Sequence, residues 1–184
     1  MIQPNEFGVF PPIDPAGRVM VSSLNNVDPK KYLFTSDRVE LFDELRTFTA
    51  TFQDVFNIRS IWIGGSFLTK KPSPGDIDAT VLVDGETINQ LIQARDLRAS
   101  LLEPAKLREF LKLNALRIDA YFLPWNPLIT TGNPSEATNI YNQQRGYWDD
   151  WWQRQRQGRK RDNPDLTWTA PRQGYLEVIV NGYS

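Results

Sequence analysis

The sequence predicts an α/β fold, in which a small mixed β-sheet is flanked by helices that lie mainly on one of its faces. Short apolar runs typical of strands alternate with longer stretches whose apolar residues recur every three or four positions. The chain has 184 residues and is 40% hydrophobic, which is enough for one packed core. We therefore expect a single domain over 1–184, with an extended arm at 1–34, a core at 35–123 and a C-terminal part at 124–184.

The composition excludes several classes of catalytic and metal site. The chain contains no cysteine and no histidine, so it lacks disulfides, cysteine nucleophiles, imidazole bases and the usual zinc ligands. Carboxylates, lysines, arginines and hydroxyls remain, and carboxylate oxygens suit hard cations such as Mg²⁺. Because the net charge is −1, any nucleic-acid binding has to come from a local cluster of positive charge.

The sequence also predicts a cytoplasmic protein that has no membrane partner. No apolar run approaches the length that crosses a bilayer, and the N-terminus has no basic and apolar leader. The lack of cysteine is compatible with that compartment.

The N-terminal third predicts an arm followed by a long helix. The first 30 residues contain five prolines, so we expect them to be extended, with a short strand at 19–21. Ser36 or Asp37 is expected to cap the next helix, over 39–56, whose apolar residues recur at helical spacing. The aromatic stripe of this helix indicates core packing.

Four further runs predict strands, and three periodic stretches predict helices. Prolines and turn residues set their limits: Thr87 is expected to cap a helix, Pro104 suits a first helical turn, and Pro124 is expected to stop a strand. In chain order we expect strands at 59–63, 77–83, 116–123 and 174–180, and helices at 87–98, 103–113 and 136–157.

Three aspartates in the predicted strands are the residues best suited to catalysis. Asp76 and Asp78 open the strand at 77–83, and Asp119 lies in the strand at 116–123. Side chains at i and i+2 of a strand point the same way, so the first two carboxylates would lie roughly 6–7 Å apart on one face. Carboxylates at this separation can hold a pair of hard cations, which lie about 3.5–4 Å apart in two-metal sites.

A glycine turn precedes these carboxylates. Gly64, Gly65 and Ser66 follow the apolar run that ends at Ile63. Glycine lets the backbone come close to a ligand, and a helix that starts there would point free amide groups at an anion. Ser66 adds a hydroxyl that can bond a phosphate oxygen, so the turn predicts a phosphate site beside the carboxylates.

This order of residues resembles the nucleotidyltransferase superfamily, which has the DNA polymerase beta-like fold. The signature of that superfamily is an apolar strand, a Gly-Gly or Gly-Ser turn, a gap, two aspartates one residue apart, and a later aspartate on a neighbouring strand. Weaker similarities flank the motif and match a poorly characterised nucleotidyltransferase-like family of bacteria and their phages. These flanking segments are 8–12, 35–41, 145–148 and 173–178.

The resemblance implies metal-dependent transfer of a nucleoside monophosphate from a nucleoside triphosphate to RNA, a protein or a small molecule. It implies two bound Mg²⁺ or Mn²⁺ ions. It also implies that the protein is a toxin or a phage or defence enzyme, with a cognate antitoxin as a further partner. The catalytic and metal-ligating residues would be Asp76, Asp78 and Asp119. The nucleotide-binding residues would be Gly64, Gly65 and Ser66.

The chain departs from the superfamily immediately after the glycine turn. Phe67 and Leu68 stand where relatives often have an arginine or another polar residue. We therefore expect Lys70 or Lys71, in the loop that follows, or the basic segment near the C-terminus to contact the triphosphate.

A basic segment near the C-terminus is the candidate contact for nucleic acid. It places five positive charges within eight positions, close to three tryptophans whose rings could stack bases. A solvated loop would account for the same charges without a ligand. The residues are Arg154, Arg156, Arg159, Lys160 and Arg161.

Two alternatives to an enzyme stay open. Asp-x-Asp pairs also occur in surface strands, Gly-Gly-Ser also occurs in ordinary turns, and a fold does not fix a function. The chain could be a catalytically inactive nucleotide-binding protein on the same fold, or a nucleic-acid-binding protein that uses the basic segment.

Overall fold

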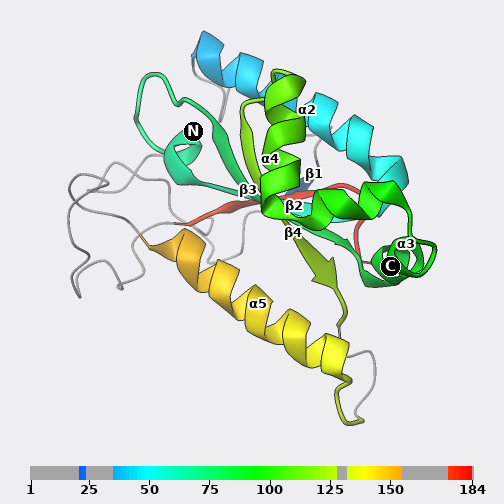
Figure 1. The fold of residues 1–184 in the computed structure, drawn as a ribbon. Coiled ribbons are helices and arrows are strands. Elements are labelled where there is room, and N and C mark those ends of the chain that lie inside the picture. Colours follow the sequence, from blue (N-terminus) through cyan, green and yellow to red (C-terminus); the bar gives the residue numbers. More distant parts are fainter. Residues whose placement is uncertain (1–20, 24–34, 128–131, 155–173, 184) are drawn as a thin grey trace.

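The structure is a computed structural model that describes residues 21–23, 35–127, 132–154 and 174–183. The described residues form one five-stranded sheet in the order β1-β5-β2-β3-β4, with helices on both faces (Figure 1). The predicted α/β fold with a mixed sheet is confirmed. The strands are β1 (Val21–Ser23), β2 (Ile58–Gly64), β3 (Ile77–Asp84), β4 (Ile118–Trp125) and β5 (Leu176–Ile179).

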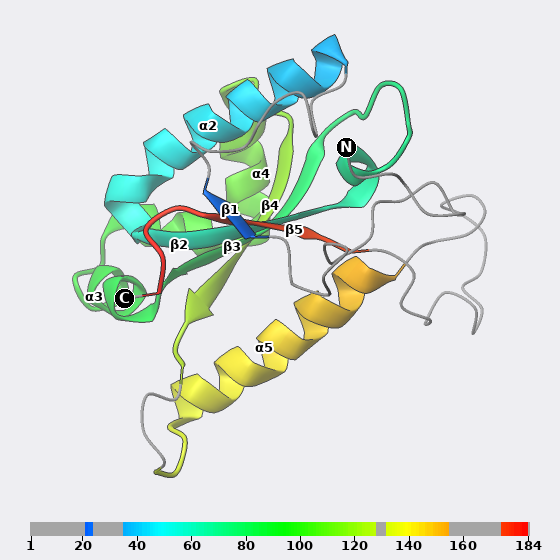
Figure 2. The same ribbon diagram turned by 180° about the vertical axis from the view of Figure 1, so that it is seen from behind.

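The strand directions place the aspartate-bearing strands as parallel neighbours. β2 runs antiparallel to β5 and β3, whereas β1 and β5, and likewise β3 and β4, are parallel pairs. Figure 2 shows β1 beside β5, and the strand order places β4 at the opposite edge of the sheet. A parallel pair needs a crossover connection. Between β3 and β4 this crossover consists of α3 (Gly85–Gln93), the 3₁₀ helix η3 (Leu97–Leu102) and α4 (Pro104–Leu113).

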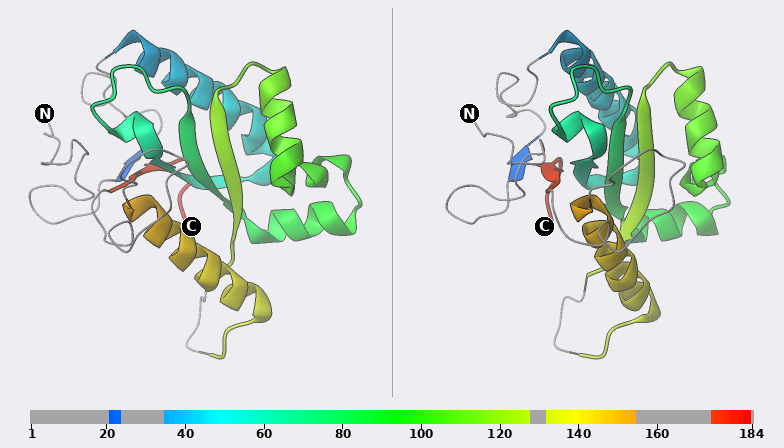
Figure 3. Two further views of the ribbon diagram at one scale, coloured as in Figure 1. Left: turned by 60° about the vertical axis from the view of Figure 1, so that its left-hand side comes forward. Right: turned by 90° about the vertical axis from the view of Figure 1, so that its left-hand side faces the viewer.

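Two apolar layers attach the helices to the sheet. α2 (Ser36–Phe56), α3 and α4 share one core with the sheet, in which the α2 phenylalanines Phe48 and Phe52 are buried and in ring contact. α5 (Glu136–Gln153) packs on the opposite face, where Trp152 and Trp62 belong to a second cluster (Figure 3). The expectation of one main helical face therefore misses α5. The central strands are buried on both faces, and such strands need a cover on each.

Local side-chain contacts move several helix ends away from their predicted positions. α2 is capped by Thr35, whose hydroxyl accepts from the Arg38 N–H, rather than by Ser36 or Asp37. α3 begins at Gly85 because the Asp84 carboxylate accepts from the Thr87 N–H at 2.9 Å. The helix predicted at 87–98 accordingly starts earlier, ends at Gln93 and is followed by η3. α5 ends at Gln153, before the predicted limit of 157.

The Asp84 carboxylate also joins the crossover to β2. Arg59 of β2 pairs with it at 2.5 Å, and the Arg59 guanidinium lies over the Trp125 ring, 5.1 Å from its centroid. Burial opposes ionisation of Asp84, but the hydrogen bonds from Arg59 and Thr87 outweigh it, so the pKa of this carboxyl is lowered. Asp84 therefore contributes to stability as a carboxylate.

The strand limits differ from the predicted ones. β2, predicted at 59–63, and β3, predicted at 77–83, are slightly longer than predicted, and β5, predicted at 174–180, is shorter. β4 starts at Ile118 rather than 116 and continues through Pro124 to Trp125. Within the described sheet β4 is an edge strand beside β3, and the missing N–H of a proline is tolerated there. β1 is described at Val21–Ser23; of the strand predicted at 19–21, the first two residues lie outside the described part of the chain. Among the helices of the described residues, none has the length and apolar character needed to cross a membrane.

Gly64, at the end of β2, is required by the packing of α5. A Cβ atom there would lie 2.4 Å from a carbon of the Trp152 ring. The same ring donates a hydrogen bond from Nε1 to the Thr80 hydroxyl at 2.9 Å and packs against Trp148. The tryptophan that anchors α5 to the sheet thus occupies the space that any side chain at position 64 would need.

We predict that Gly64→Ala destabilises the protein by about 1–3 kcal/mol, the usual cost of overpacking a core, because the Trp152 ring has to move. Gly146→Ala is the matched control: Gly146 lies inside α5 and nothing lies within 4 Å of its added Cβ. That variant should gain about 0.5–1 kcal/mol from the better helix former. Urea unfolding of both variants measures the difference. An unchanged midpoint for Gly64→Ala would contradict the packing described.

Candidate active site

Strand pairing brings two of the three predicted aspartates together. Asp78 of β3 and Asp119 of β4 are Cα partners in the parallel pair. Partners in a parallel pair project to the same face from strands about 4.8 Å apart. Both side chains are partly exposed. The two carboxylates thus occupy one side of the sheet, on the face covered by α5.

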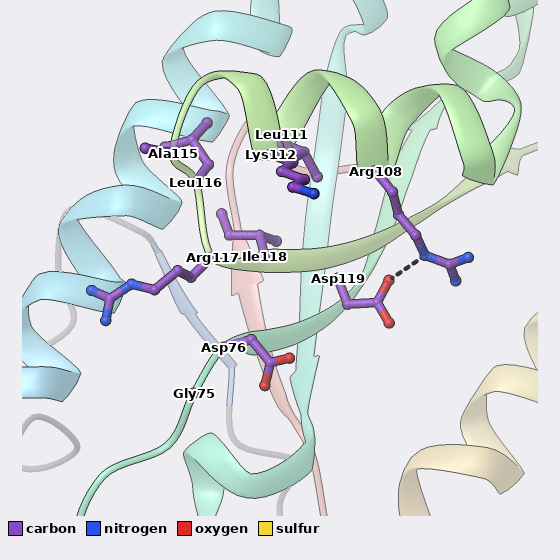
Figure 4. A pocket seen from close by; sticks show the side chains of 10 residues that line it. All are labelled: Gly75, Asp76, Arg108, Leu111, Lys112, Ala115, Leu116, Arg117, Ile118 and Asp119. Atoms are coloured by element: carbon purple, nitrogen blue, oxygen red, sulfur yellow. Dashed lines mark hydrogen bonds and ion pairs between the residues drawn. The ribbon is translucent and has the colours of Figure 1, made fainter.

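Asp76 lies just before β3 and belongs to the same region. It is exposed, and together with Asp119 it lines a pocket of about 710 Å³ between the start of these strands and α4 (Figure 4). Leu111, Leu116 and Ile118 give the pocket an apolar side. All three predicted aspartates therefore lie at the same end of the β3–β4 pair.

Gly65 brings the glycine turn against the Asp78 carboxylate. The residue has a φ of +65°, which favours glycine, and a Cβ there would lie only 1.8 Å from Asp78 Oδ2. Ser66 follows in the 3₁₀ helix η2 (Gly65–Leu68), which is only 4 residues long. The turn expected to hold phosphates therefore directly adjoins the carboxylates, while at Gly64 the available space is taken by Trp152.

The loop after η2 is held by Arg38, which the sequence analysis did not single out. This arginine is fully buried in the first turn of α2. Its guanidinium donates to the carbonyls of Phe67 and Pro72, and also to those of Thr69 at 2.6 Å and Lys71 at 2.8 Å. Burial lowers the pKa of Arg38, while Asp37 nearby counteracts this. A cation on the apolar stripe of α2 was the sequence signal for this role.

Phe67 and Leu68 are core residues, which accounts for the departure from the superfamily pattern. Lys70 and Lys71 are exposed in the loop that Arg38 holds. The Lys71 N–H bonds the Thr69 hydroxyl at 3.2 Å, so the loop backbone is ordered while both lysine side chains face solvent. Their proposed contact with a triphosphate stays a prediction.

Asp119 has two partners that the sequence analysis did not name. Arg108 of α4 donates from Nε to Asp119 Oδ1 at 3.1 Å, and the Tyr121 hydroxyl donates to Oδ2 at 3.3 Å (Figure 4 shows the first contact). Arg108 Nη2 also donates to the Tyr121 hydroxyl at 2.7 Å. The position of Tyr121, two residues after Asp119 on the same strand face, was a usable signal. Arg108, eleven residues earlier on a helix, gave none.

The pKa values of Tyr121 and Arg108 are shifted by burial and by the neighbouring Asp119 carboxylate. Burial, and next the negative charge of Asp119, raise the pKa of Tyr121, so its hydroxyl remains a proton donor. The hydrogen bond to Asp119 and the charge of that carboxylate raise the pKa of Arg108. Arg117, by contrast, turns away from the pocket toward α2 and pairs with Glu44 at 2.5 Å (Figure 4).

A family model described as a family of unknown function, DUF6932, matches residues 3–179. The chain belongs to this family. A search of curated proteins and a search of solved structures each find no match. Because the DUF6932 description carries no activity, a function has to be argued from the site.

The type of side chain at this site suits a metal ion, whereas the arrangement of the carboxylates in the described part of the chain does not form a metal site. Three carboxylates at one end of a parallel strand pair are the oxygen ligands that Mg²⁺ and Mn²⁺ prefer. In the arrangement described, Asp119 is engaged by Arg108 and Tyr121. Over the described residues, no three acidic side chains stand close enough together to hold an ion. The two expected ions stay a prediction.

Arg154 is the member of the basic segment that lies within the described residues. Arg154 follows the end of α5 and pairs with Asp150. Trp152 is buried in the second core, so that ring packs the fold rather than facing solvent, whereas Trp151 of the same helix is 48% exposed. Arg156, Arg159, Lys160 and Arg161 lie outside the described residues.

We predict that Arg38→Lys destabilises the protein by about 1–3 kcal/mol, the cost of leaving buried acceptors without donors. A lysine ammonium cannot reproduce the planar fork that serves several carbonyls at once. Arg46→Lys is the control, because Arg46 is a partly exposed α2 residue paired with Asp43, and such changes usually stay within about 0.5 kcal/mol. Urea unfolding gives the comparison. Equal effects of the two substitutions would show that Arg38 does not hold the loop.

We further predict that Gly65→Ala and Asp78→Ala are coupled. Alone, Gly65→Ala combines backbone strain of about 1–2 kcal/mol with displacement of the Asp78 carboxylate. In an Asp78→Ala background only the backbone strain remains, so the cost of the alanine should fall. A double-mutant cycle on unfolding free energies measures this coupling. Additive effects would place the glycine turn away from the carboxylate.

Proposed function

We propose that the protein is a metal-dependent nucleotidyltransferase that moves a nucleoside monophosphate from a nucleoside triphosphate to an acceptor hydroxyl. The observation that carries the proposal is the contact between the Gly65 turn and Asp78, together with the pairing of Asp78 with Asp119. A phosphate-accepting turn and adjacent carboxylates from separate parts of the chain are what the chemistry requires. The resemblance to the nucleotidyltransferase superfamily supports the same reading.

In this proposal different residues of the chain would bind the phosphates, hold the metal ions and take the acceptor proton. Gly65 and Ser66 would bind the β- and γ-phosphates. Asp76 and Asp78 would hold the metal ions. Asp119 would join the ion beside the acceptor hydroxyl and would help take its proton. The acceptor oxygen forms a bond to the α-phosphorus, the bond from that phosphorus to the β-phosphate oxygen breaks, and pyrophosphate leaves. Bound divalent cations would neutralise the charge that builds on the phosphates.

The acceptor and the biological role rest on the resemblance. RNA, protein and small molecules are the acceptor classes it implies, and a toxin or a phage or defence enzyme with a cognate antitoxin is the setting. Lys70 and Lys71 are exposed cations in the loop that follows the glycine turn, and we propose them for a triphosphate contact.

The test is transfer of an α-labelled nucleotide in the presence of Mg²⁺ or Mn²⁺. Each of the four nucleoside triphosphates is incubated with the protein and with total RNA, total protein or a small-molecule extract as acceptor. We expect label in one acceptor fraction, and we expect Asp78→Asn and Asp119→Asn to lower the rate at least about a hundredfold, as loss of one group that stabilises transition-state charge does.

Asp54→Asn is the matched control, since Asp54 is an exposed α2 carboxylate away from the pocket. It should transfer label like the parent. Absence of transfer with every nucleotide, or full transfer by both site variants, would refute the enzyme. Metal-dependent nucleotide binding without transfer would instead support the inactive nucleotide-binding alternative.

A further inference from the structure

Arg108 binds the Asp119 oxygen that the proposed chemistry needs as a metal ligand. In the structure its Nε donates to Asp119 Oδ1, and this pair is the ion-pair contact of Asp119 among the described residues (Figure 4). The other carboxylate oxygen accepts from Tyr121. Arg108 has to leave Oδ1 before that oxygen can ligate a cation, because two positive charges at one oxygen repel each other.

The ion pair is built in a way that allows this exchange. The Arg108 side chain is 52% exposed and that of Asp119 34% exposed, and solvent-exposed pairs of this kind contribute little to stability. Arg108 projects from α4 into the mouth of the pocket that Asp76 and Asp119 line. It can therefore change partners without disturbing the core.

Tyr121 provides a second contact that the guanidinium can keep. Arg108 Nη2 donates to the Tyr121 hydroxyl at 2.7 Å, and the guanidinium carbon lies 5.5 Å from the Tyr121 ring centroid. The Trp148 ring of α5 packs against the Tyr121 ring, with ring centroids 4.6 Å apart. A guanidinium that pivots on Tyr121 keeps its remaining N–H groups close to Asp119 and available for an anion.

We propose that Arg108 is a triphosphate-binding residue that pairs with Asp119 in the free protein and transfers to a substrate phosphate when the site is loaded. The inference rests on the proposed function and adds to it. A planar guanidinium donates two parallel hydrogen bonds to a phosphate as it does to a carboxylate. Arg108 would thus supply, from α4, the phosphate-binding arginine that superfamily members often carry just after the glycine turn. At that position this chain has Phe67 and Leu68.

The exchange predicts opposite effects of one substitution on two ligands. Arg108→Gln removes the cation that competes at Asp119, so Mn²⁺ alone should bind more tightly, by about fivefold to tenfold. The same variant loses charged hydrogen bonds to phosphate, so Mn²⁺ with inorganic tripolyphosphate should bind about tenfold more weakly or worse. A purely structural arginine would weaken both or change neither.

The experiment measures Mn²⁺ binding by electron paramagnetic resonance and Mn²⁺–tripolyphosphate binding by calorimetry, on the full chain. Tripolyphosphate makes the test independent of which base the site accepts. Lys112→Gln is the matched control, because it removes the same charge from the same pocket without removing the Arg108–Asp119 contact. Arg108→Lys keeps the charge and should bind Mn²⁺ alone like the parent.

The outcomes separate the two proposals. Opposite shifts for Arg108→Gln with little change for Lys112→Gln support the exchange. If the parent binds Mn²⁺–tripolyphosphate and Arg108→Gln leaves both affinities unchanged, or weakens both, the role of Arg108 is refuted while the nucleotide site stands. If the parent binds no Mn²⁺–tripolyphosphate, the nucleotide site itself fails. Near-ultraviolet circular dichroism confirms that each variant is folded.

Discussion

The parallel pairing of β3 with β4 is the constraint on which the rest of the site depends. Its register sets Asp78 beside Asp119, although the two residues are separated in the chain by a whole crossover of helices. The antiparallel pairing of β2 with β3 then sets Gly64 opposite Asp78, so the next residue, Gly65, turns against the same carboxylate. The backbone pairing of β3 with its two neighbours therefore brings together Asp78, Asp119 and the glycine turn.

Two adjacent glycines serve different neighbours in this arrangement. Gly64 leaves room for the Trp152 ring, which ties α5 to the sheet through Thr80, and Gly65 leaves room for the Asp78 carboxylate. The Gly64-Gly65 pair resembles a single phosphate-binding motif, but Gly64 is required for packing against Trp152. The site and the second core share a border at this point, so changes in α5 packing are expected to reach the carboxylates.

Two arginines illustrate how exposure decides what a cation does. Arg38 is buried and satisfies several carbonyls of one loop, which fixes the path of the chain between η2 and the aspartates. Arg108 is half exposed and has a carboxylate and a phenol as partners. Removing a buried cation leaves acceptors without donors, whereas an exposed one can exchange partners at low cost.

The sequence by itself determined the elements and the kinds of residue the site contains. Apolar periodicity predicted α2 and the strands, and the absence of histidine and cysteine left carboxylates as the metal ligands of choice. Only the tertiary structure decided that α5 covers the second face, that Trp152 fills the space at Gly64, and that Arg108 pairs with Asp119. Periodicity reports local conformation, whereas these contacts depend on strand register and helix placement between residues far apart in the chain.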